Sequence, residues 1–256
     1  MKQVLLTVAA GKRLIGKALS CHPEIEKALD KGTIVIIAGT TNSYVVQEIF
    51  KLTGETRPFE RTHFFRGITL SPDYKVSESG RLPDKSGIQG DVVIQNGVWL
   101  PGKTINDVAE GLKEGDIVLK GANALDLTHR RAAVLIGNPN GGTTIPILQA
   151  LIGRRIRLIL PVGLEKRIPG DLDSLANKLN APGVKGWRYM PIPGEVFTEI
   201  EALFWLTGVN AELFASGGVS GAEGCGWLVV TGSPSQEAAA EKILESLGSE
   251  PPFNLG

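Results

Sequence analysis

Short runs of apolar, often β-branched residues alternate with amphipathic stretches of helical period along most of the chain. The apolar runs are continuous, which is typical of strands covered on both faces in a parallel sheet. The amphipathic stretches between them supply the crossover helices that parallel strands need. The pattern therefore predicts an α/β fold with a mostly parallel sheet flanked by helices. The expected strands are residues 2–8, 33–38, 91–95, 116–120, 132–137 and 156–162, and the expected helices are 12–20, 23–31, 42–52, 104–113, 144–153 and 171–180.

The pattern changes after residues 180–183, which read Asn-Ala-Pro-Gly. From there a strand, a helix, two strands and a helix follow, and this βαββα order predicts a small ferredoxin-like α+β unit. We expect an α/β ligand-binding domain over residues 1–183, a small α+β domain over 184–249 and a frayed tail over 250–256. The elements expected in the second part are strands 186–192, 210–216 and 226–231 and helices 195–206 and 234–247.

Residues 55–90 fit neither pattern, because three prolines and several charges interrupt them. A connection of this length is usually functional or mobile. Its basic and aromatic residues have two interpretations: they fold over an anionic ligand, or they form a salt-bridged loop with an aromatic anchor. These residues are Arg57, Phe59, Arg61, His63, Phe64, Phe65 and Arg66.

Composition excludes several classes of protein. Lys and Arg number 27, as do Asp and Glu, so the net charge of zero argues against a nucleic-acid partner. No apolar run approaches the roughly 18 residues of a membrane span. The two cysteines, Cys21 and Cys225, lie far apart and indicate structural thiols in a reducing compartment. The sequence thus predicts a cytoplasmic protein without a membrane partner.

No cofactor or metal site is indicated, since His22 and His129 lack partners at metal-ligand spacing. The segment from Gly11 to Lys17 matches the G-x-x-x-x-G-K of a nucleotide-binding loop. Ala18 stands where that loop needs a hydroxyl, so we interpret the segment as an amphipathic helix with a basic face.

Glycine makes up 32 of the 256 residues, well above the average of about 7%. Five of these glycines lie within residues 217–226, directly before a strand. A dinucleotide-binding fingerprint would open a helix, so we interpret this segment as a flexible loop between two strands that could close over the first domain.

The most informative signal occurs twice: an apolar strand runs through a Gly- and Thr-rich turn into a helix. A helix N-terminus offers free N–H groups and a positive dipole to an anion, and ligands lie at the carboxyl ends of strands in open α/β sheets. The turns predict a ligand with one or two phosphate or carboxylate groups. The candidate ligand-binding residues, with two from the loop between the turns, are Gly39, Thr40, Thr41, Asn42, Gly121, Asn123, Gly141, Gly142, Thr143 and Thr144.

Polar residues also follow the strands between and after these turns. Lys120, Asn123 and Asp126 enter one loop, and Lys166 enters a later one together with Arg167. Such positions carry working groups on many sheets. Alternatively, the Asn and Asp are ordinary turn residues and the later cations are surface charges. A third group, Glu195, Glu199 and Glu201, is expected to complement a helix dipole or lie exposed.

The order of these motifs resembles a known superfamily. Strand-Gly-Thr-Thr-helix, then Gly121-Ala122-Asn123 and a Gly-Thr helix start, are similar to the fold shared by ribose-5-phosphate isomerase, glucosamine-6-phosphate deaminase, DeoR-type effector domains and CoA transferases. The closest local likeness, over about residues 30–168, is to methylthioribose-1-phosphate isomerase and its relatives. Those relatives carry an Asp where this chain has Asn123, so the acid that shuttles protons there is absent unless Asp126 replaces it.

The resemblance and the turns together predict an isomerase-like or transferase-like enzyme acting on a small phosphorylated or carboxylated metabolite, of the sugar-phosphate or CoA type. Lys120 or Lys166 would stabilise developing negative charge, and Asp126 would transfer protons. The alternative is a non-catalytic, metabolite-binding sensor or a structural protein of the same fold. Proteins of this fold class often form homo-oligomers, and we expect one here.

Overall fold

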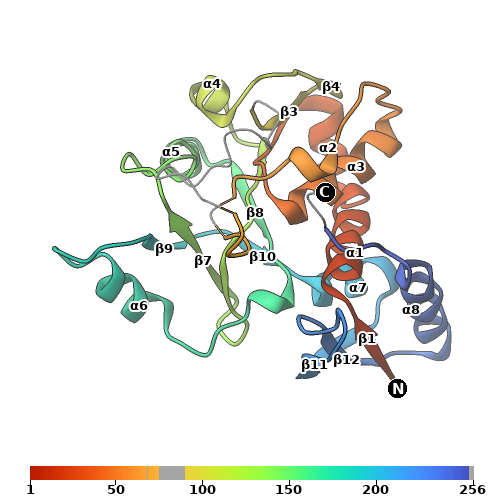
Figure 1. The fold of residues 1–256 in the computed structure, drawn as a ribbon. Helices are drawn as coiled ribbons and strands as arrows, with labels where there is room; N and C mark the ends of the chain where they lie inside the picture. The colour runs from red at the N-terminus through yellow and green to blue at the C-terminus, as the bar shows by residue number, and fades with distance from the viewer. Residues whose placement is uncertain (68, 75–89, 254–256) are drawn as a thin grey trace.

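A six-stranded sheet forms the centre of the protein (Figure 1). The structure is a computed structural model that describes residues 1–67, 69–74 and 90–253. The strand order is β10-β8-β5-β2-β3-β4; the first four strands are parallel, and β3 and β4 extend the sheet in antiparallel pairing. The mixed α/β fold with mostly parallel strands was predicted correctly. The strands are β2 (Thr33–Ile36), β3 (Val92–Gln95), β4 (Val98–Trp99), β5 (Ile117–Leu119), β8 (Arg157–Pro161) and β10 (Glu195–Phe197).

Helices cover both sides of this sheet, and their apolar faces complete the main core. Predicted helix positions agree with the structure to within a few residues, except that 104–113 divides into α4 and a short 3-10 turn. No helix in the described ranges is both long and apolar enough to cross a membrane. The helices are α1 (Val8–Ser20), α2 (Pro23–Lys31), α3 (Thr40–Thr53), α4 (Ile105–Val108), α5 (Thr144–Arg154), α6 (Leu172–Leu179), α7 (Glu199–Thr207) and α8 (Pro234–Leu247).

A second sheet contains β6 (Ala124–Asp126), β7 (Arg131–Ile136) and β9 (Arg188–Ile192), all antiparallel. Residues 132–137 were expected in the parallel sheet. They do form a strand, but a short turn joins β7 to β6 as a hairpin, and β9 takes the other edge of β7. The Gly-rich turn after β7 therefore reaches the site from a separate sheet.

The third sheet, at one end of the molecule in Figure 1, joins the two ends of the chain. Its order is β1 (Lys2–Leu6), β12 (Gly226–Thr231), β11 (Asn210–Ser216), all antiparallel. The expected C-terminal elements are present, but the ferredoxin-like unit is not confirmed. The strand at 188–192 pairs with β7 instead, and β1 from the N-terminus takes the free edge of β12.

The segment that resembles a nucleotide-binding loop lies inside α1, as its helical interpretation required. Its glycines allow close packing: a Cβ on Gly16 would lie 3.0 Å from backbone atoms of Tyr44 in α3, and one on Gly11 would lie 2.4 Å from Glu199 Oε1. The expected basic face is wrong, because Lys12 is only 8% exposed and Arg13 only 9%. Close approach by α3 and α7 buries that side of α1.

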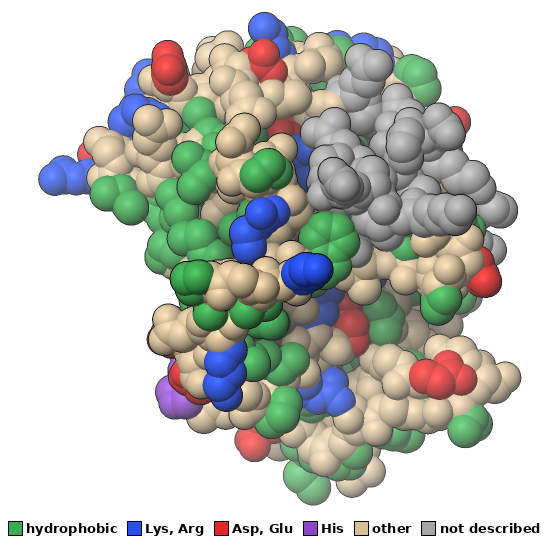
Figure 2. Space-filling model, turned by 60° about the vertical axis from the view of Figure 1, so that its left-hand side comes forward, with side chains coloured by type: hydrophobic (Ala, Val, Ile, Leu, Met, Phe, Trp, Pro, Cys, Tyr) green, Lys and Arg blue, Asp and Glu red, His purple; other side chains and the backbone are tan. Residues whose placement is uncertain are grey.

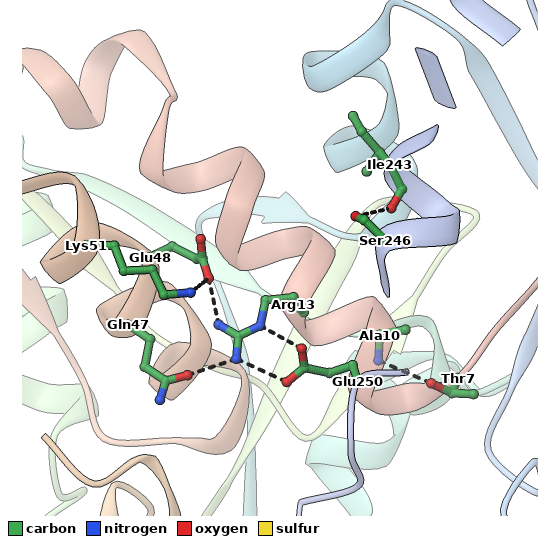
Figure 3. A network of polar contacts seen from close by, with 9 residues as sticks. All are labelled: Thr7, Ala10, Arg13, Gln47, Glu48, Lys51, Ile243, Ser246 and Glu250. Atoms are coloured by element: carbon green, nitrogen blue, oxygen red, sulfur yellow. Dashed lines mark hydrogen bonds and ion pairs between the residues drawn. The ribbon is translucent and has the colours of Figure 1, made fainter. Parts of the chain in front are cut away.

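Arg13 joins α1, α3 and the C-terminal segment through one guanidinium group (Figure 3). It donates to Glu48 Oε1 at 2.7 Å, to Gln47 Oε1 at 2.9 Å and to both carboxylate oxygens of Glu250 at 3.0 Å. The same group stacks over the ring of Tyr44, 4.6 Å from its centroid. The segment from Glu250, which was expected to be frayed, is therefore anchored to α1.

We predict that Arg13→Ala lowers the free energy of unfolding by about 3 kcal/mol, because the largely buried Glu250 carboxylate loses its cation and Glu48 keeps only Lys51. Urea denaturation measures the change. Lys27→Ala on the exposed side of α2 is the matched control, with an expected change below about 0.5 kcal/mol. Equal stability of the two variants would contradict the structural role of Arg13.

Candidate functional site

The four parallel strands end at one edge of the sheet, and each delivers polar side chains there. Residues 37–42 follow β2, residues 120–123 follow β5, residues 163–166 follow β8, and Glu199 follows β10. A cavity of about 1240 Å³ opens at this edge. Ligands of open α/β sheets bind at this edge. Figure 2 shows several Lys and Arg side chains in the middle of one face of the molecule, beside the grey segment.

The first Gly-Thr-Thr turn places the N-terminus of α3 at this cavity. The Asn42 side chain donates to Ile37 O at 2.8 Å and to Leu119 O at 3.1 Å, and so fixes the turn to the ends of β2 and β5. Thr41 Oγ1 and Asn42 Oδ1 are buried without a hydrogen-bond partner. Thr41 is 2% exposed and lines the cavity. An unpaired hydroxyl beside a helix N-terminus is a donor available to an anion.

The second turn lines the same cavity from the other sheet. Gly141 and Gly142 have φ angles of +78° and +56°, which glycine adopts without steric cost. They lead the chain from β7 into α5, whose N-cap is Thr143. The Lys120 ammonium donates to Thr143 Oγ1 at 3.1 Å and so links the two turns through the end of β5. Both predicted turns are thus brought together, although they belong to different sheets.

Four cationic side chains line the cavity, and none of its described lining residues is acidic. Lys12 donates to Thr40 Oγ1 at 3.2 Å, and Lys166 donates to Ala122 O at 2.7 Å. Arg66 is paired with Asp91, and Lys120 lies between the turns. Such a lining favours an anionic ligand. Lys12 and Arg66 were not predicted to lie beside the two turns, because neither residue follows a parallel strand.

The fully buried carboxylate of Asp91 organises one side of the cavity. It accepts hydrogen bonds from Ala38 N at 3.1 Å and Ile105 N at 3.0 Å, besides pairing with Arg66. These three donors come from the turn after β2, from α4 and from the 55–90 segment. Because Asp91 uses both its oxygens on protein donors, it holds Arg66 at the cavity.

Burial lowers the pKa of each of the three cavity lysines, and different neighbouring charges act on Lys120 than on the other two. The pKa of Lys120 falls to about 8, first by desolvation and then by the charge of Arg66. Desolvation also lowers the pKa of Lys12 and Lys166, but Glu165 and Glu199 oppose the shift in both. The Lys120 amine can therefore lose its proton near pH 8.

Glu199 and Glu165 form a buried acidic pair behind the cavity. Glu199 is 4% exposed and accepts a hydrogen bond from Leu164 N at 3.0 Å. Desolvation and the neighbouring Glu165 raise the pKa of Glu199 to about 8. The expectation that it complements a helix dipole or lies exposed is wrong for this residue, since α1 covers it at Gly11. Nothing in the local sequence around Glu199 indicates that its side chain is buried.

The other two glutamates do lie near the surface. Glu195 pairs with Arg157 at 2.7 Å. Glu201 accepts from Thr198 N at 2.7 Å as part of the capping box of α7, and it also pairs with Arg130.

Asp126 is not brought to the cavity. It ends β6 and accepts from His129 N at 3.0 Å, with His129 Nδ1 at 2.8 Å, inside the β6–β7 hairpin. It does not appear among the described lining residues. Asn123 does line the cavity, and its Oδ1 accepts from Leu135 N at 3.0 Å, which fixes the start of the same hairpin. Gly121 lies beside it in the lining, whereas Arg167 does not.

The 55–90 segment combines features of both its interpretations. Phe59 and Phe64 pack in an aromatic cluster with Phe50, and Arg57 pairs with Glu55, as in an anchored loop. Phe65 and Arg66, however, line the cavity. Residue 68 and residues 75–89 lie outside the described residues.

Two other predicted features lie away from the cavity. Residues 217–226 connect β11 to β12, and none of them is a lining residue. His22 is buried and accepts from Glu24 N at 3.3 Å as the N-cap of α2. The described part of the chain contains no group of three or more His, Cys, Asp or Glu side chains suited to a metal ion.

A neighbouring groove of about 930 Å³ shares Asn138, Asn140 and Gly141 with the cavity. Its arginines are already engaged: Arg131 pairs with Asp173, and Arg188 donates to the carbonyls of residues 136 and 137. The larger cavity, in contrast, is lined by three lysines whose ammonium groups hydrogen-bond only neutral oxygen atoms of the described residues.

Comparison with known proteins adds no assignment. No protein-family model, curated protein or solved structure matched this chain.

We predict that Glu199→Gln removes a pH dependence of stability. The folded state keeps the Glu199 proton up to about pH 8, whereas the unfolded chain releases it near pH 4.5. The stability that this proton confers is complete below about pH 4.5 and is lost as the pH rises through 8. Relative to the wild type, the variant therefore gains roughly 3–4 kcal/mol between pH 5 and pH 8.

Urea denaturation at several pH values measures this difference. Gln retains the acceptor for Leu164 N, so folding is preserved. Glu110→Gln at an exposed position is the control, and its curve should stay parallel to the wild type. If the Glu199 variant also stays parallel, Glu199 does not titrate as inferred.

Proposed function

We propose that this protein is an isomerase-like or transferase-like enzyme that binds a small phosphorylated or carboxylated metabolite in the cavity at the carboxyl edge of the sheet. One observation carries the proposal: Lys12, Arg66, Lys120 and Lys166 line this cavity, and no acidic side chain does so among the described residues. A phosphate or carboxylate would neutralise these cations and accept hydrogen bonds from both turns.

The arrangement of the turns supports this class of ligand. Thr41 Oγ1 is a buried hydroxyl without a partner, and a ligand oxygen would satisfy it. The resemblance to the ribose-5-phosphate isomerase and CoA transferase superfamily suggests sugar phosphates or CoA compounds. Lys120, Lys166 and Lys12 would then stabilise negative charge on the bound metabolite.

A non-catalytic metabolite sensor is the second candidate. It is favoured by the position of Asp126, which lies in the hairpin and leaves no carboxylate in the described lining. Carboxylate-mediated proton transfer then has no donor at the cavity wall. Both candidates require the anion site, and only turnover separates them.

The first test is ligand-dependent thermal stability. Ribose 5-phosphate, CoA or inorganic phosphate, at about 100 times its Kd, should raise the melting temperature by about 5–10 °C. Chloride at the same ionic strength controls for screening. No response to any of these anions would contradict the enzyme and the sensor alike.

We further predict that Thr41→Val separates binding from stability. The substitution removes a buried, unpaired hydroxyl, so the free energy of unfolding should rise by about 1 kcal/mol. Loss of its hydrogen bond to the ligand should weaken phosphate binding about 5–10-fold in calorimetry. Thr53→Val, at the exposed end of the same helix, is the matched control. Unchanged affinity in the Thr41 variant would place the anion elsewhere.

A further inference from the structure

Lys120 is a buried cavity lysine that hydrogen-bonds the second turn and, like Lys166, has no ion-pair partner in the described ranges. It directly follows β5, is 9% exposed and lines the cavity. Its amine hydrogen-bonds a neutral hydroxyl, Thr143 Oγ1, at 3.1 Å. No carboxylate oxygen in the described ranges lies within 4.0 Å of it, whereas Lys12 has Glu165 at that distance.

Of the two charged groups that act on Lys120, Arg66 favours its neutral form and Asp91 opposes it. Asp91, the acid that acts on it, already binds Arg66, Ala38 N and Ile105 N. Arg66 places a second positive charge nearby, and burial removes water from the ammonium. These influences together lower the pKa of Lys120 to about 8, so a substantial fraction of the amine is unprotonated in mildly alkaline solution. A desolvated lysine beside another cation is the usual form of an activated amine nucleophile.

The neighbouring groups have separate roles available to them. Lys12 and Lys166 experience the attraction of Glu165 and Glu199, which favours their charged forms. With Arg66 and the two turns, they suffice to hold an anionic group. Thr143, at the N-terminus of α5, holds the Lys120 amine beside the second turn.

We propose that Lys120 is a catalytic nucleophile that forms an imine with the aldehyde or ketone group of a phosphorylated substrate. The inference rests on the proposed function and specifies its substrate class. In this step the Nζ lone pair attacks the carbonyl carbon, and the C=O π electrons move to oxygen. The nitrogen loses protons and the oxygen gains them, and the oxygen leaves as one water molecule when the C=N bond forms.

An imine also brings an electron-withdrawing group to a cavity whose described lining holds no carboxylate. The protonated C=N group draws electrons from the substrate carbon next to it and so weakens the bonds at that carbon. The electron sink would then come from the substrate's bond to Lys120 instead of from an acid at position 123.

Reductive trapping tests the inference. We would incubate the protein with glyceraldehyde 3-phosphate and sodium cyanoborohydride, which reduces an imine to a stable secondary amine. Intact-mass and peptide mass spectrometry should find one adduct per chain, on Lys120, formed at least 10 times faster than on any other lysine. Excess inorganic phosphate should slow this labelling, because it competes for the turns.

Lys120→Arg keeps a cation in the cavity but removes the primary amine, and it should abolish the specific adduct while retaining phosphate binding in calorimetry. Lys27→Arg, at an exposed position on α2 outside the cavity lining, is the matched control and should still be labelled on Lys120. Adducts spread over surface lysines, or equal labelling of the Lys120 variant, would overturn the inference.

Phosphate binding distinguishes the two possible failures. If the wild type binds phosphate in calorimetry but gives no Lys120 adduct, the imine inference fails and the anion site stands. If it neither binds phosphate nor gives the adduct, both proposals fail.

Discussion

The side-chain amide of Asn42 is the contact on which the arrangement of the cavity depends. It donates to the carbonyls of Ile37 and Leu119, where two neighbouring parallel strands end. Buried carbonyls that leave a sheet need another donor, and this one comes from the first turn of α3. The Asn42 amide therefore holds the N-terminus of α3 against Leu119, the residue before Lys120. Both the anion-binding turn and the candidate nucleophile take their positions from it.

Charge is arranged around this edge in two layers. The lining layer contains cations, and the layer behind it contains the carboxylates of Glu165 and Glu199. Desolvation lowers the pKa of Lys12 and Lys166, and the two acids oppose that shift, while burial and Glu165 raise the pKa of Glu199. Neither Glu165 nor Glu199 is among the groups that act on Lys120, so its pKa depends on burial, Arg66 and Asp91 instead.

Much of the site was predictable from local sequence because its main parts are strand-to-helix turns. Periodicity located β2 and β5 and the helices after them, and the rule that ligands lie at the carboxyl ends of strands placed Thr41 and Lys120 at the cavity. Periodicity does not determine pairing partners. The strand before Gly141 was therefore assigned to the parallel sheet, although β6 and β9 take it into another one.

Residues that reach the site through tertiary packing left weaker signals. Lys12 and Arg13 look like a solvated helix face until α3 and α7 are seen to cover them. Glu199 resembles an ordinary first-turn acid, and only its contact with Gly11 shows its burial. Lys12 and Arg13 lie on α1, and Glu199 lies on α7. In each case a helix that is distant in the sequence packs over the polar side chain and shields it from water.

The position of Asn123 has a physical explanation in this architecture. Its side-chain oxygen accepts from Leu135 N and holds the β6–β7 hairpin against the end of β5. An Asp could accept the same hydrogen bond, but its negative charge would lie in a cavity whose described lining has only cations, and it would compete with an anionic ligand. Asn therefore preserves the hairpin and adds no negative charge to the cavity.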